Sequence, residues 1–185
     1  MGMANPIYYT ADLVRALPDD GNHYETVYGE LLVTPAPSTW HQVVLGRLQY
    51  RLMNYLETSS AGSAGIALAS PADISWGPDI LVQPDLFVAD LDQVRTLEWA
   101  SIRCLLLAVE VLSPSSVRAD RFTKRRLYQE QKIPLYWIVD GSAQVVEVWT
   151  PETQFPKFER EQLVWQPDGV DHPFTMSVGD LFRPL

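Results

Sequence analysis

The first third of the chain has short segments of regular hydrophobic and polar spacing. Residues 10–17 follow a helical pattern, with Thr10 as a candidate N-cap. Residues 24–34 read as two short β runs joined by a turn at Gly29-Glu30, which predicts a hairpin.

A much longer helical pattern covers residues 39–57. Its apolar positions recur every three or four residues, so they share one face of a helix. The members of this inward stripe are His41, Leu45, Leu48, Leu52, Tyr55 and Leu56. The glycines between positions 62 and 65 then break the chain.

The middle of the chain is rich in β patterns. Short runs occupy residues 66–69, 72–76 and 80–89. Residues 104–112 form the most apolar stretch, whose length and composition suit a strand buried on both faces. We therefore expect Cys104 to be a packed thiol in a buried strand rather than a nucleophile.

The second half alternates between helix and strand. Residues 120–132 have a helical composition, and residues 135–140 and 144–150 predict a hairpin around a tight turn. Residues 154–185 suggest one or two more strands and a short helix near positions 178–182. A helix inserted between strands predicts a mixed sheet flanked by helices, of the α/β or α+β class.

Length and composition limit the class of protein. The 185 residues suit one domain, covering residues 1–185. A single cysteine excludes a disulfide framework and a multi-cysteine zinc site. There is no apolar run long enough to cross a membrane, and the N-terminus does not resemble a secretory signal. We therefore expect a cytoplasmic protein with no membrane contact.

Charge is unevenly distributed along the chain. The formal net charge is −9, which argues against a protein that coats nucleic acid through its overall field. Residues 118–132 are the exception, since six of them are basic and two are acidic. Such a stripe suits a phosphate-bearing ligand, and a solvated helix face is the alternative interpretation.

Two carboxylates lie in unexpected positions. The sequence lacks the phosphate-binding, zinc-protease and serine-hydrolase motifs. Glu110 lies inside an apolar run, where an ionised carboxylate is costly unless it is paired or bound to a metal. Asp85 repeats the pattern after Pro84. Two such oxygen ligands, completed by water and substrate, suit Mg²⁺. The alternatives are a glutamate that caps the sheet end and a simple turn aspartate.

Lys124 completes this group of polar residues. Helical spacing places it on the same face as Leu127 and Tyr128, so its ammonium points toward the sheet and needs an anion there. Arg121 and Arg125 lie on a neighbouring face and could contact phosphates. An exposed helix lysine is the alternative interpretation of Lys124.

The order of these motifs resembles the Uma-two family of putative endonucleases, in the PD-(D/E)XK superfamily. The matching residues are 84–85, 109–114, 120, 124, 128 and 133–140. The resemblance runs from about residue 24 to residue 150 and includes segments 29–31 and 35–41. It implies a restriction-endonuclease-like mixed sheet flanked by helices, with an extra N-terminal hairpin and extra C-terminal strands.

The resemblance also implies site residues. Asp85 and Glu110 correspond to the carboxylates that hold Mg²⁺ or Mn²⁺, and the carbonyl of Val111 to a further ligand. Lys124 corresponds to the catalytic lysine, carried on the helix after the motif. With Asp85 and Glu110 it makes the expected catalytic set.

Other positions are peripheral or depart from the family pattern. Glu30 corresponds to an extra carboxylate ligand and His41 to a contact of the substrate phosphate. Leu112 stands where the superfamily usually has lysine. Lys132 and Leu135 replace a common glycine and glutamate, which affects loop and partner details more than the acid pair.

Three functions fit these observations. The first is metal-dependent hydrolysis of phosphodiester bonds in DNA. The second is a catalytically silent nuclease-fold module that binds nucleic acid or a protein partner, which the acidic net charge and the lack of a DNA-reading element favour. The third is hydrolysis of another small phosphate substrate.

Two further expectations concern surfaces. Residues 144–150 are expected to form a sheet edge and a dimer contact, and the resemblance implies a homodimer. Trp40, Trp76 and Trp149 are expected to pack inside the protein rather than to act as stacking platforms.

Overall fold

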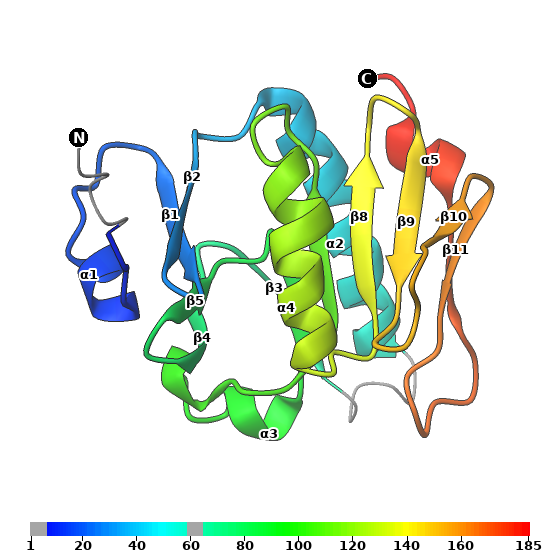
Figure 1. Ribbon diagram of the computed structural model, residues 1–185. Coiled ribbons are helices and arrows are strands. Elements are labelled where there is room, and N and C mark those ends of the chain that lie inside the picture. Colours follow the sequence, from blue (N-terminus) through cyan, green and yellow to red (C-terminus); the bar gives the residue numbers. More distant parts are fainter. Residues whose placement is uncertain (1–6, 59–64) are drawn as a thin grey trace.

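The computed structural model describes residues 7–58 and 65–185 (Figure 1). Residues 1–6, at the N-terminal end that was compared with a secretory signal, lie outside these ranges. The expected glycine break lies outside them too, except for its last residue.

The strands form three sheets. The largest has the order β10-β9-β8-β7-β6-β3, with β7 and β8 parallel and the other neighbours antiparallel. Its strands are β3 (Ile66–Ala69), β6 (Leu86–Ala89), β7 (Leu105–Val111), β8 (Tyr136–Asp140), β9 (Val145–Trp149) and β10 (Lys157–Glu159).

The two smaller sheets come from the ends of the chain and from the segment before β6. One has the order β2-β1-β5-β4, and the other is the pair β11-β12. Their strands are β1 (His23–Val27), β2 (Glu30–Thr34), β4 (Ile74–Gly77), β5 (Ile80–Val82), β11 (Gln162–Trp165) and β12 (Phe174–Ser177). The predicted mixed fold, with its N-terminal hairpin and added C-terminal strands, is therefore confirmed.

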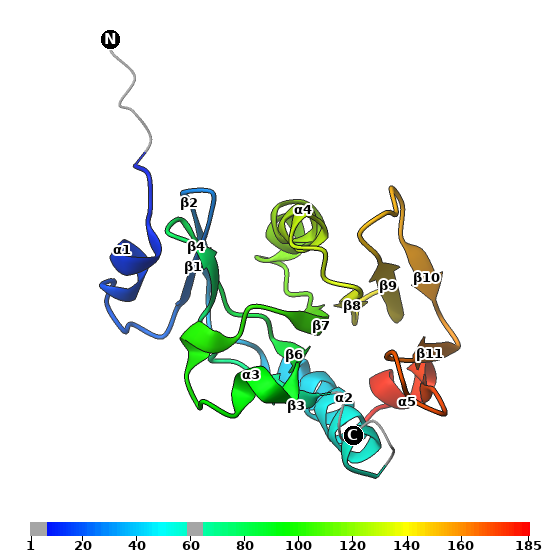
Figure 2. The same ribbon diagram turned by 90° about the horizontal axis from the view of Figure 1, so that it is seen from below.

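Helices cover both faces of the largest sheet (Figures 1 and 2). The helix α4 lies on one face, and α2 and α5 lie on the other (Figure 2). The helical elements are α1 (Ala11–Arg15), α2 (Thr39–Thr58), α3 (Leu91–Val94), the 3-10 turn η2 (Trp99–Ser101), the π-helical turn η3 (Ala119–Lys124), α4 (Arg125–Glu130) and α5 (Val178–Phe182). Thr10 accepts a hydrogen bond from the Leu13 amide, as the predicted N-cap requires.

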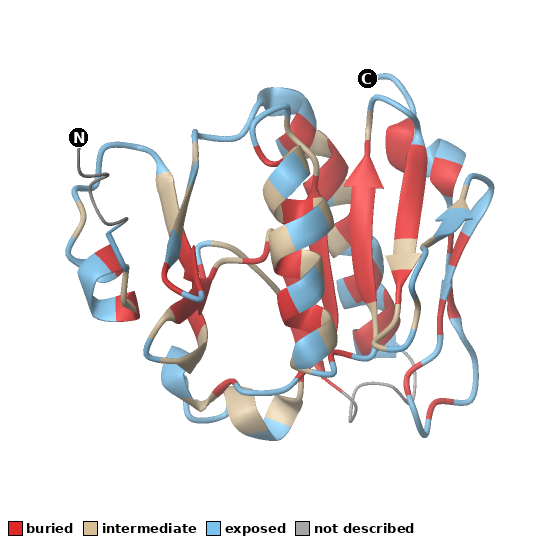
Figure 3. Cartoon of the chain, in the orientation of Figure 1, coloured by how far each residue is buried: buried red, intermediate tan, exposed pale blue. Residues whose placement is uncertain are grey.

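Side chains of β7 alternate between two hydrophobic cores. Leu107 and Val109 belong to the core under α2, whereas Ala108 packs in the core that contains Leu127 of α4. Because both faces are covered, every residue of β7 except the partly buried Leu106 is buried (Figure 3). The same alternation places Glu110 on the side of α4.

The β run expected at residues 80–89 is two strands rather than one. β5 belongs to the four-stranded sheet and β6 to the six-stranded sheet, and the chain crosses between them at residues 83–85. Pro84 has no amide hydrogen, so it cannot continue a ladder of backbone hydrogen bonds. Asp85 therefore lies immediately before β6, where the chain crosses between the two sheets.

Two expectations about β strands were wrong. Cys104 is exposed because β7 begins only at the next residue. β9 is not a sheet edge, since β10 pairs with it on the side away from β8. The structure therefore gives no support to a homodimer that forms through β9.

The three tryptophans expected to be buried differ from one another. Trp149 is buried, Trp76 is partly buried, and Trp40 is 38% exposed, so the packing prediction fails for Trp40. Within the described ranges, no helix has both the length and the apolar character needed to cross a membrane.

Candidate active site

A cavity of about 390 Å³ opens between the two larger sheets, beside the start of α2 and the inward face of η3. Its ionisable lining residues are His23, Glu25, His41, Asp85, Glu110, Asp120 and Lys124. The structure thus brings together the expected catalytic set and His41, and it adds two carboxylates that were not assigned to the site.

Glu110 and Lys124 form a buried pair. The Lys124 Nζ atom lies 3.0 Å from Glu110 Oε1, and the Tyr128 hydroxyl donates to the same oxygen at 2.9 Å. Burial raises the pKa of Glu110 well above its ordinary value, although the charge of Lys124 opposes this shift. The sequence-based placement of the lysine on the inward helix face is therefore confirmed.

Lys124 has two further acidic neighbours. Its Nζ atom lies 2.8 Å from Glu25 Oε2 and 3.6 Å from Asp120 Oδ1. Burial lowers the pKa of Lys124, but the three surrounding carboxylates raise it well above its ordinary value. The ammonium group therefore keeps its proton at neutral pH.

Asp85 reaches the same cavity from the neighbouring strand. Its Oδ2 atom accepts a hydrogen bond of 2.8 Å from the Val111 amide. Because β6 and β7 are antiparallel, with Leu86 opposite Val109, the start of β6 lies beside the end of β7. This register explains why Asp85 and Glu110 line one cavity.

His41 contacts Asp85 from the first turns of α2. Its Nε2 atom lies 3.1 Å from Asp85 Oδ2. Burial lowers the pKa of His41, but the hydrogen bond and charge of Asp85 outweigh this and raise the pKa above its ordinary value. The imidazole thus orients the carboxylate of Asp85.

The cavity contains more negative than positive charge. Glu25, Glu110 and Asp120 surround the single lysine, Lys124, and Asp85 lines the same cavity. Burial raises the pKa of Asp120 to about 6, and its Oδ1 atom is buried without a hydrogen-bond partner in the described part of the chain. A site with this surplus favours a bound cation.

The donor set fits a hard divalent cation. The hydrogen bonds to Asp85 end on Oδ2 and those to Glu110 end on Oε1, which leaves one oxygen of each for a ligand. Val111, whose carbonyl is the further expected ligand, also lines the cavity. No three His, Cys, Asp or Glu side chains in ranges 7–58 and 65–185 are arranged to hold a metal by themselves. Such a cation would therefore need backbone, water or substrate oxygens as well, as Mg²⁺ commonly does.

Glu30 does not belong to this site. It is exposed at the start of β2 and lines a separate hollow together with Arg118 and Thr123. The hairpin carboxylate that lines the cavity belongs to Glu25, in the preceding strand β1. The structure therefore does not support Glu30 as an extra ligand.

Arg121 and Arg125 also lie away from the cavity. Arg121 Nε donates to Glu147 Oε1 at 2.7 Å, and its Nη2 donates to Asp140 Oδ2 at 2.8 Å. The Arg125 guanidinium lies over the Trp149 ring, 4.8 Å from its centroid. Both arginines are thus engaged on the β8–β9 side of the helix, which does not favour the expected contacts with substrate phosphates.

Glu25 is the main residue that sequence reasoning missed. Its side chain is buried, with Oε2 on Lys124 and Oε1 accepting a 2.6 Å hydrogen bond from the Gln83 amide. The available signal was a charged residue inside a β run that ends at Val27. The same argument that singled out Glu110 applies to Glu25.

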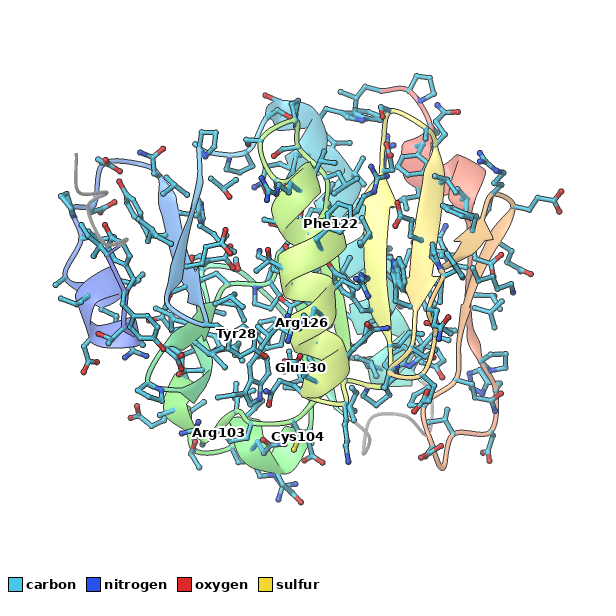
Figure 4. The ribbon with its side chains drawn as sticks, viewed as in Figure 1. Tyr28, Arg103, Cys104, Phe122, Arg126 and Glu130 are labelled. Atoms are coloured by element: carbon cyan, nitrogen blue, oxygen red, sulfur yellow. The ribbon has the colours of Figure 1, made fainter. Side chains whose placement is uncertain are left out.

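The outer face of the helix formed by η3 and α4 is exposed to solvent, unlike the face that lines the cavity. Figure 4 shows Phe122 and Arg126 on this exposed face and Tyr28 reaching from the hairpin toward Glu130. The Tyr28 hydroxyl donates to the Glu130 carboxylate. This contact joins the β1–β2 hairpin to α4.

Comparisons with known proteins agree with this architecture. A solved structure described as a putative nuclease belonging to DUF820 from Anabaena variabilis ATCC 29413 aligns with a TM-score of 0.75. The alignment has 21% sequence identity and covers 94% of this chain and 97% of that one, so it shows a shared fold. No curated protein matches the chain significantly. The model of the family "Uma2: Putative restriction endonuclease" matches residues 11–178, and the chain belongs to this family.

Proposed function

We propose that this protein is a metal-dependent endonuclease that hydrolyses phosphodiester bonds in DNA, with Mg²⁺ or Mn²⁺ as its cofactor. The observation that carries the proposal is the convergence of Asp85, Glu110 and Lys124 on one cavity. Membership of the Uma2 family supports a nuclease-type function, and superfamily members generally use divalent metals. A cytoplasmic location remains part of the proposal.

The residues divide into ligands and supports. Asp85, Glu110 and the Val111 carbonyl would hold the cation. When bound, a divalent ion polarises the phosphate and lowers the pKa of a bound water. His41 fixes the Asp85 carboxylate through Oδ2, so that its other oxygen faces a ligand in a defined orientation.

Lys124 supplies positive charge beside the phosphate. Its ammonium stays protonated and can stabilise the negative charge that develops on the phosphate oxygens. Glu25 and Asp120 hold the ammonium in place at 2.8 Å and 3.6 Å. Of the three residues expected to contact phosphates, only His41 lines the cavity.

A DNA-nicking assay tests the proposal. Purified protein with Mg²⁺ or Mn²⁺ is expected to nick plasmid DNA, and chelation of the metal is expected to stop the reaction. Asp85→Asn is expected to lower the rate at least about 100-fold. Glu30→Gln is the matched control, since Glu30 lies outside the cavity and this variant should keep full activity. Undiminished nicking by Asp85→Asn would overturn the proposal.

One observation favours the silent-module alternative. Lys124 is neutralised by its carboxylate neighbours, and Arg121 and Arg125 are engaged elsewhere, so little free positive charge faces the cavity. A thermal unfolding experiment with added Mg²⁺ separates the two functions. A stabilisation that disappears in Glu110→Gln supports the metal site, and no stabilisation of the wild type supports the module.

A further inference from the structure

A second cavity adjoins the first at the C-terminal ends of β7 and β8. Its volume is about 700 Å³, and it is bounded by the start of α2, residues 111–117 and residues 140–142. The two cavities share the lining residues Pro35, Pro37, His41, Val111 and Ser113. A ligand held at the carboxylates could therefore extend directly into this second space.

The linings of the two cavities are opposite in character. The ionisable residues of the second cavity are Arg121 and Asp140, which form a 2.8 Å ion pair, and His41 at the boundary with the first cavity. Much of the remaining wall is apolar, and includes Val44, Leu112 and Val117. The second cavity thus suits an uncharged group attached to a phosphate that a cation in the first cavity would hold.

Trp40 is the aromatic residue of this wall, and neighbouring residues hold its indole in place. The Arg47 guanidinium lies over the ring, 5.8 Å from the centroid, and donates to the Leu181 carbonyl at 3.1 Å. A Cβ atom at Gly141 would come within 3.2 Å of the indole nitrogen, so glycine there leaves room for the ring. The indole lines the second cavity and is 38% exposed, so a ligand in this cavity can contact it.

We propose that the second cavity is a nucleobase subsite, in which Trp40 stacks on the base of a nucleotide adjoining the reacting phosphate. A nucleotide joins an anionic phosphate to a flat base, which matches an acidic metal-binding cavity continuous with an apolar aromatic one. Stacking on an indole is tolerant of sequence because every base has a π-face. The inference rests on the proposed function and specifies the substrate of the same site.

The subsite also determines which DNA the protein accepts. A base within an intact duplex has both faces covered by its neighbours, so it must be unstacked or flipped out to reach Trp40. Unpaired DNA avoids that cost. The protein is therefore expected to bind single strands and unpaired regions more tightly than perfect duplexes.

Equilibrium binding tests the subsite without any need for cleavage. The probe is a fluorescein-labelled single-stranded 12-mer, measured by anisotropy in Ca²⁺ in place of Mg²⁺, with the matching duplex alongside. Trp40→Leu is expected to weaken binding of the single strand about tenfold or more, and Trp40→Phe less, because a phenyl ring keeps part of the stacking. Trp99→Leu is the control, since Trp99 is 42% exposed and lies outside both cavities.

A second measurement guards against a fold defect in Trp40→Leu. Circular dichroism checks the variant, and if it is unfolded, the comparison of wild type with Trp40→Phe takes its place. In the cleavage assay, Trp40→Leu should raise KM about tenfold with kcat within about threefold, because stacking supplies binding of the substrate. A residue with a purely structural role would instead lower the active fraction and leave KM unchanged.

The outcomes separate this inference from the proposed function. Trp40-dependent binding of single strands without any cleavage would retain the subsite and reject the nuclease. Metal-dependent cleavage with unchanged KM and affinity in Trp40→Leu would retain the nuclease and overturn the subsite. Tighter binding of the duplex than of the single strand, or no binding of the 12-mer by the wild type, would also overturn it.

Discussion

One helix, η3 continued by α4, carries an ion network on each of two sides, one buried around Lys124 and one partly buried around Arg121. Lys124 faces Glu25, Glu110 and Asp120 on one side, and Arg121 faces Asp140 and Glu147 on the other. Each network surrounds one cation with two or three carboxylates. The networks differ in how many of the carboxylate oxygens have hydrogen-bond partners.

The Arg121 network is satisfied by additional donors. Asp140 Oδ1 accepts from the Ser142 hydroxyl and from the amides of Ser142 and Ala143, and Trp149 Nε1 donates to Glu147 at 3.3 Å. Burial raises the pKa of Asp140, but these hydrogen bonds, with Arg121, bring it below its ordinary value.

The Lys124 network is left incomplete. Burial raises the pKa of Asp120 to about 6, and one of its oxygens has no hydrogen-bond partner in the part of the chain that is described. Asp85 and Glu110 each keep an oxygen for a ligand. The comparison indicates that carboxylate oxygens left without hydrogen-bond partners beside a cavity, rather than the number of ion pairs, distinguish the proposed site from the Arg121 network.

The largest difference is expected in catalysis. Glu110→Gln should lower the rate of DNA nicking at least about 100-fold, because it removes a proposed metal ligand. Glu147→Gln changes the same residue type in the other network and should keep the rate per folded molecule within about threefold. The measurement is nicking normalised to the folded fraction, and equal losses in both variants would remove the distinction between the networks.

The next effect concerns the metal itself. At a concentration of 100 times its Kd, Mg²⁺ should stabilise the wild type by about 2.7 kcal/mol. For a chain of this size that corresponds to roughly 5–10 °C in Tm. Thermal unfolding should show this shift in Glu147→Gln and not in Glu110→Gln. A shift that persists in Glu110→Gln would place the metal elsewhere.

The Arg121 network should matter mainly for stability. Arg121→Gln leaves Asp140 and Glu147 without their cation, and partial solvent screening at a side chain that is 32% exposed moderates the loss. We expect the free energy of unfolding in urea to fall by about 2 kcal/mol, with unchanged Mg²⁺ affinity. A loss of Mg²⁺ affinity at unchanged stability would assign Arg121 to the metal site instead.

A smaller effect is expected from Asp120 and pH. Its folded pKa of about 6 lies above its ordinary value of 3.8, so the folded state binds the proton more tightly. The resulting stabilisation is present at about pH 4 and is lost as the pH rises through about 6.

The variant Asp120→Asn removes this contribution. Its stability relative to the wild type should therefore improve by about 1–2 kcal/mol between pH 4.5 and pH 7, measured by urea unfolding at both values. Groups far from Asp120 titrate equally in both proteins and cancel in the difference, whereas the charge of Asp120 also raises the pKa of Glu110 and of His41. A difference between the two proteins that does not change with pH would show that Asp120 stays ionised throughout.

The sequence predicted correctly which side chains face the interior where the spacing of neighbouring residues decides this. The spacing of Lys124, Leu127 and Tyr128 correctly placed the ammonium on the inward face, because this stretch follows the regular helix α4, of which Lys124 is the N-cap. The apolar run around Glu110 correctly marked it as a buried carboxylate that needs a partner, and the structure shows that the partner is Lys124. The start of β6 was misjudged as part of one long strand, although Pro84 was a signal for the break.

The remaining errors have different physical causes, of which long-range packing is the first. Whether Glu25 or Glu30 enters the site depends on how the hairpin docks against α4 through Tyr28, which no local pattern reveals. Arg121 lies in the π-helical turn, whose spacing differs from the 3.6-residue period used to place it. Cys104 was assigned to β7 although the strand begins one residue later.

The central claim is tested most directly by the position of a bound cation. A crystal of the protein soaked in Mn²⁺ would give an anomalous difference map that locates the ion without any assumption about activity. We expect one strong peak within roughly 2.5 Å of carboxylate oxygens of both Asp85 and Glu110. A cavity without such a peak at saturating Mn²⁺, or a peak bound only by other residues, would contradict the account.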